Sequence, residues 1–266
     1  MPGDLERERR TAMAAAEEAG ALLAASFHSA HTVHAKGGRD VVLNLDLAAE
    51  KIIVTRLREA FPDDRIVSEE AGDHGPQGGR TWLVDPLDGT NNVAIGLPAY
   101  AVGIGLMDGG RPVLGVVHEP VTGATFHAVA GRGAYGPAGR LTGPDSVLPE
   151  SGPVVAWTQG YGVGRDPTAA RIRAELERES WRVLQLWAPL LGWVLLARGT
   201  IDAFVGYCAE GVDLPAGALL AAEAGAELRT LDGEVFTPDH TGPAEGRSFV
   251  AARGENLAWG RLRCSV

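Results

Sequence analysis

Apolar residues near the start of the chain recur about every 3.6 positions, which is typical of amphipathic helices. This spacing predicts a long helix from Asp4 to about His31, and Asp4 can cap its start. A second helix is expected over 47–60, closed by Phe61-Pro62. The glycine-rich segment between them, HAKGGRD at 34–40, predicts a loop. The first sixty residues are therefore expected to be mainly helical.

Short apolar runs separated by turn residues follow, and they predict β-strands. The first run, 65–68, leads into the acidic pair Glu69-Glu70 and then into a turn or loop, DHGPQGG at 73–79. Further strands are expected at 81–84, 99–107, 113–118 and 124–130. Because only short turns such as Asp108-Gly109-Gly110 separate the last three runs, they should form an antiparallel meander.

The second half of the chain alternates between strand and helix patterns. Glycine and proline accumulate over 136–152, which places a boundary near residue 145 between an α+β half (1–145) and an α/β half (146–266). Strands are expected at 154–158, 182–186, 203–207 and 248–252, and helices at 167–179, 189–198 and 215–224. The longest apolar stretch, 183–197, is shorter than the roughly 20 residues that a membrane helix needs, so it is interpreted as buried.

Length, charge and cysteine content narrow the function classes. At about 150 residues per domain, 266 residues predict one large or two small domains. The net charge of −10 argues against a nucleic-acid polymer or a membrane surface as partner, because both need a cationic surface. Two distant cysteines, Cys208 and Cys264, predict no disulfide framework and a reducing, cytoplasmic setting. The charged start, MPGDLERERR, predicts no secretion signal.

The segment WLVDPLDGTNN at 82–92 carries the most specific chemical signal. A strand delivers Asp85 to a turn in which Gly89 permits a conformation that other residues resist. Asp88 then lies near Asp85, and the amides of Gly89 and Thr90 can face the same space, where an anion could bind. Two carboxylates beside exposed amides suit Mg²⁺ and phosphate. The simpler interpretation is an Asx turn that closes a strand.

Two more acidic positions accompany this turn. Glu69 follows the strand-like IVS and precedes Gly72, and its simpler interpretation is a solvated acidic pair. Asp213 lies in GVDLPAGALLAAEAG just before a predicted helix, and its simpler interpretation is a helix N-cap.

Together these motifs resemble the inositol monophosphatase family of Mg²⁺-dependent, lithium-sensitive phosphomonoesterases. That family carries an acidic pair after a strand, then D-P-[IL]-D-G-T-x-N, and later W-D-x-A-A-G, an apolar helix and E-A-G-G. This chain has SEEAG at 68–72, DPLDGTNN at 85–92 and VDLPAGALLAAEAG at 212–225, in the same order and with similar spacing. The resemblance extends from about Lys36 to the C-terminus. It implies a layered αβαβα sandwich of the inositol monophosphatase and fructose-1,6-bisphosphatase type, with the site between the two halves, and a homodimer.

The resemblance also implies a role for each matching residue. Two or three Mg²⁺ ions would be held by Glu69, Asp85, Asp88, Asp213 and the Leu87 carbonyl, with Asp85 as the bridging ligand. The catalytic set would be Thr90 and Asp46, which orient the attacking water, together with Glu69. The Gly89 and Thr90 amides would hold the phosphate, and Lys36 would lie near the outer metal. The implied reaction is in-line attack of activated water on a small phosphate ester, without a phosphoenzyme.

Departures from the family pattern concentrate where the alcohol part of the substrate is recognised. The glutamate that contacts inositol hydroxyls in the family falls at Gly206, which should leave room for another group. Trp157, Tyr161 and Trp187 lie in segments that face the leaving group in this family. Aromatic faces stack on bases and on apolar sugar faces, so we expect a nucleoside or modified-sugar monophosphate from a specialised biosynthetic pathway. For each aromatic residue, burial in the core is the alternative.

Other functions stay open at this point. Inositol 1-phosphate, 3′-phosphoadenosine 5′-phosphate and histidinol phosphate are alternative substrates within the family. A non-catalytic sensor of a phosphorylated ligand is an alternative of another class, although the presence of all four carboxylates and Thr90 argues against it.

Overall fold

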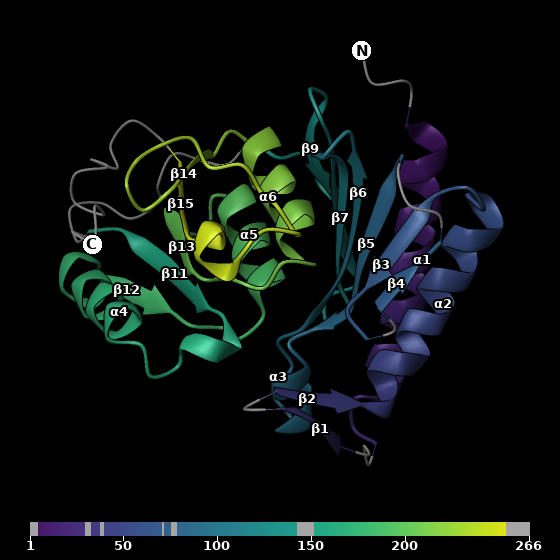
Figure 1. Cartoon of the computed structure of the whole chain (residues 1–266), viewed down its shortest axis with the longest axis horizontal. Coiled ribbons are helices and arrows are strands. Elements are labelled where there is room, and N and C mark those ends of the chain that lie inside the picture. Colours follow the sequence, from purple (N-terminus) through teal and green to yellow (C-terminus); the bar gives the residue numbers. More distant parts are fainter. Residues whose placement is uncertain are drawn as a thin grey trace.

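Helices and sheets alternate in five layers along the long axis of the molecule (Figure 1). Helices α1 (Glu6–Ser26) and α2 (Asn44–Ala60) cover one face of an eight-stranded sheet. Helices α5 (Pro189–Ala197) and α6 (Leu214–Glu223) lie between this sheet and a five-stranded sheet. Helix α4 (Pro167–Glu179) covers the outer face of the smaller sheet. The predicted αβαβα sandwich is therefore confirmed.

This computed structural model describes residues 5–29, 33–37, 40–70, 72–75, 79–142 and 152–253, without the side chains of 33–37, 40–43 and 74. The proposed cap Asp4, the second cysteine Cys264 and the predicted boundary near residue 145 lie outside the described residues. Cys208 is buried and forms no disulfide with any described residue. Among the described helices, none is long and apolar enough to cross a membrane.

The larger sheet contains the predicted meander and one parallel pair. Its strand order is β10-β9-β8-β7-β6-β5-β3-β4, and only β3 and β5 pair in parallel. The strands are β3 (Arg65–Ser68), β4 (Gly72–His74), β5 (Thr81–Asp88), β6 (Ala101–Asp108), β7 (Arg111–Glu119), β8 (Ala124–Val129), β9 (Gly133–Gly136) and β10 (Gly139–Arg140). The loop predicted over 73–79 is wrong at its start, because Asp73 and His74 pair with β3 in strand β4.

The smaller sheet has the order β12-β11-β13-β15-β14. Its strands are β11 (Val154–Gln159), β12 (Arg182–Leu184), β13 (Ala203–Tyr207), β14 (Glu227–Arg229) and β15 (Phe249–Ala252). The remaining short elements are α3 (Thr90–Ala94), η1 (Tyr161–Val163) and η2 (Ala244–Arg247). The loop predicted over 34–40 is wrong for most of its residues: β1 (Val33–Gly37) and β2 (Asp40–Leu43) pair antiparallel, with Gly37 opposite Asp40 and a register shift between Ala35 and Gly37.

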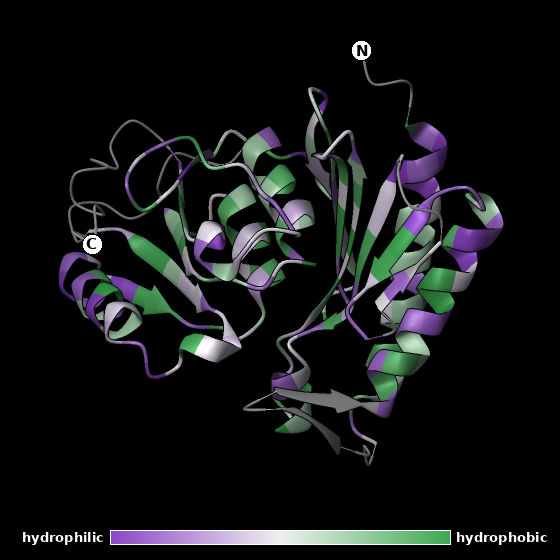
Figure 2. Ribbon diagram, in the orientation of Figure 1, coloured by the Kyte–Doolittle hydropathy of each residue, from purple (hydrophilic) through white to green (hydrophobic). Residues whose placement is uncertain are grey.

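The two helices between the sheets are apolar on all sides, because both of their faces are covered. Figure 2 shows them mostly green or white, whereas α2, α4 and the upper end of α1 carry purple segments. The stacked rings of Trp193 and Phe249, with centroids 4.7 Å apart, join α5 to β15, and Phe204 packs edge-on against both. This aromatic cluster forms the centre of the core on the side of the smaller sheet.

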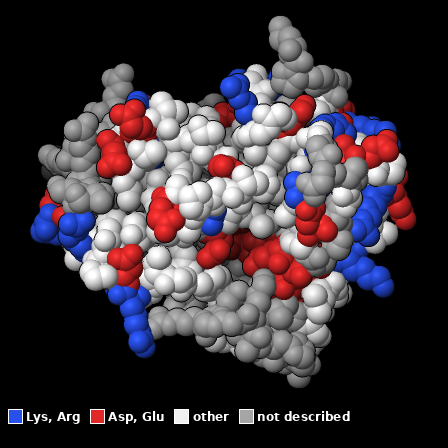
Figure 3. Space-filling view, viewed as in Figure 1, with Lys and Arg blue, Asp and Glu red and all other residues white. Residues whose placement is uncertain are grey.

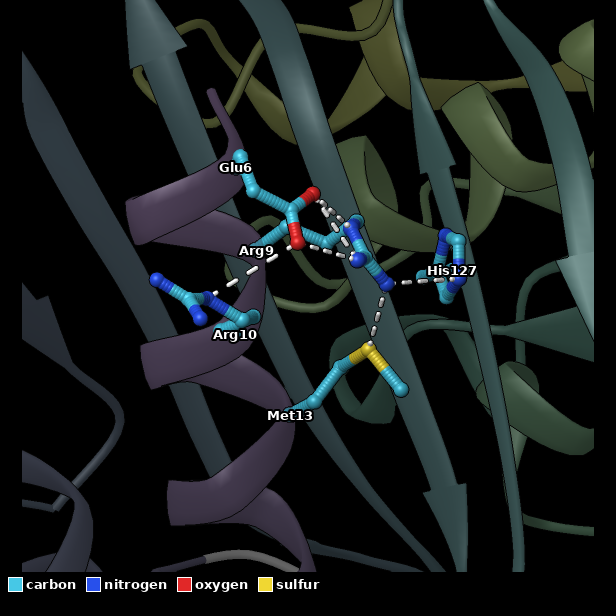
Figure 4. Close-up of polar contacts among 5 residues, drawn as sticks. All are labelled: Glu6, Arg9, Arg10, Met13 and His127. Atoms are coloured by element: carbon cyan, nitrogen blue, oxygen red, sulfur yellow. Dashed lines mark hydrogen bonds and ion pairs between the residues drawn. The ribbon is translucent and has the colours of Figure 1, made fainter. Parts of the chain in front are cut away.

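The beginning of α1 is attached to the larger sheet by a polar network (Figure 4). The Arg9 guanidinium pairs with Glu6 at 2.8 Å, and its Nη1 lies 3.2 Å from His127 Nε2 on β8. Burial, and then the Arg9 charge, lower the pKa of His127, so its ring is neutral at pH 7 and can accept this hydrogen bond. This network attaches the first turns of α1 to strand β8 of the larger sheet.

Candidate active site

Parallel pairing of β3 and β5 brings the first two acidic motifs together. Ser68 pairs with Val84, so both strands reach the same edge of the sheet together, and the next residues are Glu69 and Asp85. The Glu69 N–H donates to the Val84 carbonyl at 3.1 Å, which continues the pairing by one bond. Burial raises the pKa of Asp85, and the neighbouring charge of Glu69 raises it further. The sheet topology thus places two carboxylates of separate motifs side by side.

The DPLDGT turn has an unusual backbone that Gly89 makes possible. The Leu87 N–H donates to Asp85 Oδ1 at 3.0 Å, so the Asx turn of the simpler interpretation is present. Strand β5 continues irregularly to Asp88, four residues beyond the predicted end. Gly89 has φ +96°, and a Cβ there would lie 2.8 Å from the Ala99 carbonyl oxygen. Only glycine fits this position, and α3 begins directly after it.

Thr90 and Asp46, both predicted in the catalytic set, are in direct contact. The Thr90 hydroxyl lies 2.8 Å from Asp46 Oδ1 and 2.8 Å from the Leu87 carbonyl oxygen. Both partners are acceptors, so the hydroxyl proton points toward them and the oxygen lone pairs remain available to another donor. Asp46 is buried in the first turn of α2, which fixes it against α3.

Contacts of Asp88 and Asp213 connect the first half of the chain to the second. The Leu190 N–H, at the start of α5, donates to Asp88 Oδ2 at 2.7 Å. Burial and the charge of Asp213 raise the pKa of Asp88, which this hydrogen bond opposes. Burial and the charge of Glu69 raise the pKa of Asp213 to about 7. Asp213 occupies the N-cap position of α6, as in the simpler interpretation, and the Leu214 N–H opposes the rise in its pKa.

The chemistry of this group fits a divalent cation. The strongest influences on the pKa of the three buried aspartates, apart from burial itself, are mostly other carboxylates. Buried carboxylates that repel one another are costly without a counter-charge, and an all-oxygen donor set suits Mg²⁺. Among the described residues, no three acidic or imidazole groups form a ready-made cage. Mg²⁺ commonly binds through one or two carboxylates and completes its shell with water and substrate phosphate. Figure 3 shows Asp and Glu gathered in the middle of the face, where the halves meet.

The structure separates the predicted substrate residues into two groups. Tyr161 is 44% exposed and Trp187 is 56% exposed, and hydrogen bonds from α3 reach the Tyr161 hydroxyl and the Leu186 carbonyl next to Trp187. Trp157 is only 2% exposed and packs in the core beneath α4, so the prediction that it lines the site is wrong. Trp157 lies on the same face of β11 as Val155, toward α4, whereas Val154 and Ala156 pack into the core on the other face.

Gly206 does not leave the room that was predicted for a substrate group. It lies in β13 opposite Phe249, and a Cβ at this position would be 2.3 Å from the Phe249 ring. Phe249 therefore fills the space beside Gly206, and the prediction that Gly206 borders the substrate is wrong. Lys36 lies in β1, but its side chain is outside the described part of the chain.

Glu50 is a buried carboxylate beside the site that the sequence reasoning missed. It is buried on α2, one turn after Asp46, and its Oε1 accepts from the Ser68 hydroxyl and from the Glu70 N–H at 3.3 Å. Glu50 thus holds the segment on both sides of Glu69. The spacing of Asp46 and Glu50 by four residues, on one face of a helix, was the available signal.

Comparison with known proteins now places the chain in a family. The sequence model of the "Inositol monophosphatase family" matches residues 4–259. The chain belongs to the inositol monophosphatase family. Members of this family are phosphoric monoester hydrolases, so this chain is a phosphatase.

Relatives of this phosphatase include proteins with different names. Inositol monophosphatase 1 of Solanum lycopersicum is 33% identical over 247 residues, which cover 88% of each chain. Nus factor SuhB of Escherichia coli (strain K12) is 33% identical over 218 residues, which cover 80% of this chain and 81% of that protein. The crystal structure of extragenic suppressor protein suhB from Bartonella henselae superposes with a TM-score of 0.84 at 26% identity, covering 97% and 96% of the two chains.

Proposed function

We propose that this phosphatase hydrolyses a small-molecule monophosphate with the help of Mg²⁺. The ligands would be Glu69, Asp85, Asp88, Asp213 and the Leu87 carbonyl, and two or three ions would bind. When bound, Mg²⁺ lowers the pKa of water and neutralises charge on the phosphate and the leaving alkoxide. The observation that carries the proposal is the meeting of buried, mutually repelling carboxylates from both halves beside the Gly89 turn.

The protein groups around these carboxylates support the division of labour that the family resemblance implies. Thr90 directs its proton toward Asp46 and Leu87, so its oxygen can accept a hydrogen bond from the attacking water and hold it in line. Glu69 would share in this positioning from the β3 side. The backbone N–H groups of Gly89 and Thr90 would bind the phosphate oxygens, because the left-handed Gly89 allows consecutive amides to face one ligand.

For the alcohol part of the substrate we propose a nucleoside or modified-sugar monophosphate from a specialised biosynthetic pathway. The exposed rings of Tyr161 and Trp187 support this proposal, because they offer stacking faces beside α3. Inositol 1-phosphate, 3′-phosphoadenosine 5′-phosphate and histidinol phosphate are the competing substrates. A relative from Thermotoga maritima, 31% identical over 198 residues, is named fructose-1,6-bisphosphatase/inositol-1-monophosphatase, so sugar bisphosphates belong in the comparison.

We also propose that the phosphatase is a cytoplasmic homodimer without a nucleic-acid polymer as partner. The net charge of −10 supports the last point, although some relatives carry the name Nus factor SuhB. The exposed apolar side chains of Ile95 and Leu97, directly after α3, support a subunit contact. Light scattering of the purified chain tests the dimer: a monomeric mass across the micromolar range would contradict it.

The test of the proposed function is phosphate release from a panel of these monophosphates, with and without Mg²⁺. Asp88→Asn should lose nearly all turnover while keeping the circular dichroism spectrum of the wild type, because it removes one charged oxygen donor and preserves shape. Glu177→Gln, the same chemical change on the exposed face of α4, is the matched control and should keep full activity. Turnover of Asp88→Asn near the wild-type rate would contradict the metal assignment. Silence of the wild type on every substrate, with Mg²⁺ binding intact, would favour the phospho-ligand sensor.

A further inference from the structure

Trp187 is held beside the active site from both directions along the chain. The carbonyl of the preceding residue, Leu186, accepts a hydrogen bond of 2.7 Å from Asn92 Nδ2 in α3. Three residues later, the Leu190 N–H donates to Asp88 at 2.7 Å. Both anchors belong to the segment that starts with the DPLDGT turn, so the Trp187 backbone has little freedom to move away from it.

The backbone of Trp187 is strained in a way that exposes its ring. Its φ is +56°, in the left-handed region that a bulky residue rarely adopts. Such a conformation persists only where the surroundings impose it, and it is commonest at functional sites. Here the two anchors impose it, and the indole is 56% exposed instead of joining the apolar core that α5 enters next.

Tyr161 and Glu210 are hydrogen-bonded to each other, and Tyr161 also contacts α3, as the segment of Trp187 does. The Tyr161 N–H donates to Glu210 Oε1 at 3.1 Å, and the Tyr161 hydroxyl lies 3.3 Å from Asn91 Nδ2 across the junction of the two halves. The two loops touch closely: a Cβ on Gly160 would lie 2.1 Å from the Cys208 carbonyl oxygen. Cys208 itself has φ +48°, which turns the chain after β13 so that Glu210 points back toward η1.

Glu210 also lies on the approach to the metal carboxylates. It precedes Asp213 by three residues, and its charge acts on the Asp213 carboxyl. One of its oxygens is engaged by Tyr161, and an ionised carboxylate can accept several more hydrogen bonds but donate none. A ligand group next to Glu210 must therefore be a donor.

We propose that Trp187, Tyr161 and Glu210 form the subsite for the alcohol part of the substrate, and that this subsite selects a planar heterocycle bearing an amino or ring N–H donor. The proposal rests on the proposed phosphatase function and specifies its substrate. A polyol would need several hydrogen-bonding partners, whereas these three side chains offer two ring faces, one carboxylate and the Tyr161 hydroxyl, which already contacts Asn91. The place that a polyol-reading glutamate would take at Gly206 is filled by Phe249.

Three candidate substrates, each assayed with and without Mg²⁺, separate the contribution of ring stacking from that of the hydrogen bond to Glu210. They are ribose 5-phosphate, purine riboside 5′-monophosphate and adenosine 5′-monophosphate. The second adds a ring to the first, and the third adds only an exocyclic amino group to the second. We expect kcat/KM to rise about tenfold at each step, as stacking and a hydrogen bond to a charged acceptor would give. Equal kcat/KM values for all three would overturn the subsite and leave the phosphatase function standing. No Mg²⁺-dependent release from any of them, or from the wider panel, would defeat both.

Two variants test which side chain causes each of the two rises in kcat/KM. Trp187→Gly removes the ring and adopts φ +56° without strain, and it should abolish the gain from ribose to purine riboside. Glu210→Gln can keep its bond to the Tyr161 N–H while presenting an NH₂ group to the ligand, and it should abolish the gain from the amino group. The controls are Trp181→Leu and Glu177→Gln, which remove another exposed indole and another exposed carboxylate and should preserve both ratios.

Light scattering and thermal unfolding of each variant complete the experiment. If Trp187→Gly keeps both substrate ratios and dissociates an oligomer, Trp187 is a subunit contact and the proposal is wrong. If either control changes the ratios as the variants do, the effect is general and the proposal is equally wrong. If each variant loses one of the two kcat/KM gains, with unchanged mass and folding, the subsite is established.

Discussion

Replacing Asp213 by asparagine should stabilise the metal-free phosphatase while abolishing its activity. Asp213 is buried among Glu69, Asp85 and Asp88, and burial together with the charge of Glu69 raises its pKa from 3.8 to about 7. Asparagine has the same shape but carries no charge, so it removes repulsion without leaving a cavity. The substitution therefore tests separately whether the Asp213 charge destabilises the fold and whether activity requires that charge.

The magnitude follows from the pKa difference between the folded and unfolded chains. A carboxyl whose pKa rises from 3.8 to about 7 costs the folded state up to about 4 kcal/mol at pH values above 7. The folded protein then binds a proton that the unfolded chain has already released, so the free energy of unfolding falls as pH rises from about 4 to 7 and is constant above. At pH 4 the carboxyl is mostly protonated in the folded protein and the variant should gain little.

Thermal unfolding in EDTA at pH 4.5, 6 and 8 measures this effect. The variant should unfold up to about 10 °C above the wild type at pH 8, with a smaller difference at each lower pH. Asp232→Asn, an exposed aspartate, is the matched control and should follow the wild type. Millimolar Mg²⁺ should raise the wild-type midpoint more than that of the variant. An Asp213→Asn protein that is equally stable or less stable than the wild type at pH 8 would refute the electrostatic reasoning.

Two glycine substitutions test the packing that surrounds the site. Gly89→Ala should cost about 2–4 kcal/mol and most of the activity, because it adds the cost of a left-handed conformation to a contact of 2.8 Å with the Ala99 carbonyl; unfolding in urea measures it, and a cost below about 1 kcal/mol would contradict the geometry. Gly206→Glu should lower the soluble yield and the unfolding midpoint without creating inositol phosphate hydrolysis, because Phe249 occupies the space; a stable variant with new activity would show that the strand can repack.

The sequence predicted the parts of the site that local chain geometry determines. The Asp85 to Thr90 turn follows from a strand, two aspartates and a glycine that must adopt positive φ, and its residues are adjacent in the chain. The predicted bounds of α4 and β13 also agree with the structure, because a capped proline start and a short apolar and aromatic run are local signals.

Contacts between distant segments could not be read from the sequence in the same way. Trp157 and Trp187 looked equivalent as aromatic residues of the second half. Strand alternation buries Trp157 under α4, and a left-handed backbone imposed by Asn92 and Asp88 exposes Trp187. Glu210 escaped notice for the same reason, since it contacts Tyr161 on a loop that another part of the chain brings to it.

The position of Asp213 relative to Asp88 depends on how α6 packs against the larger sheet. At the end of the helix, the Glu223 carboxylate accepts from the Gly131 and Gly133 N–H groups at 2.6 and 2.7 Å. Along the helix, a Cβ on Gly115 would lie 2.5 Å from the Ala216 carbonyl oxygen, so the backbones are in close contact. Sliding or hinging of one half against the other would break these contacts. Specificity in this phosphatase is therefore expected to reside in the loops that carry Tyr161, Trp187 and Glu210, which can differ between relatives while the packing that places the carboxylates is kept.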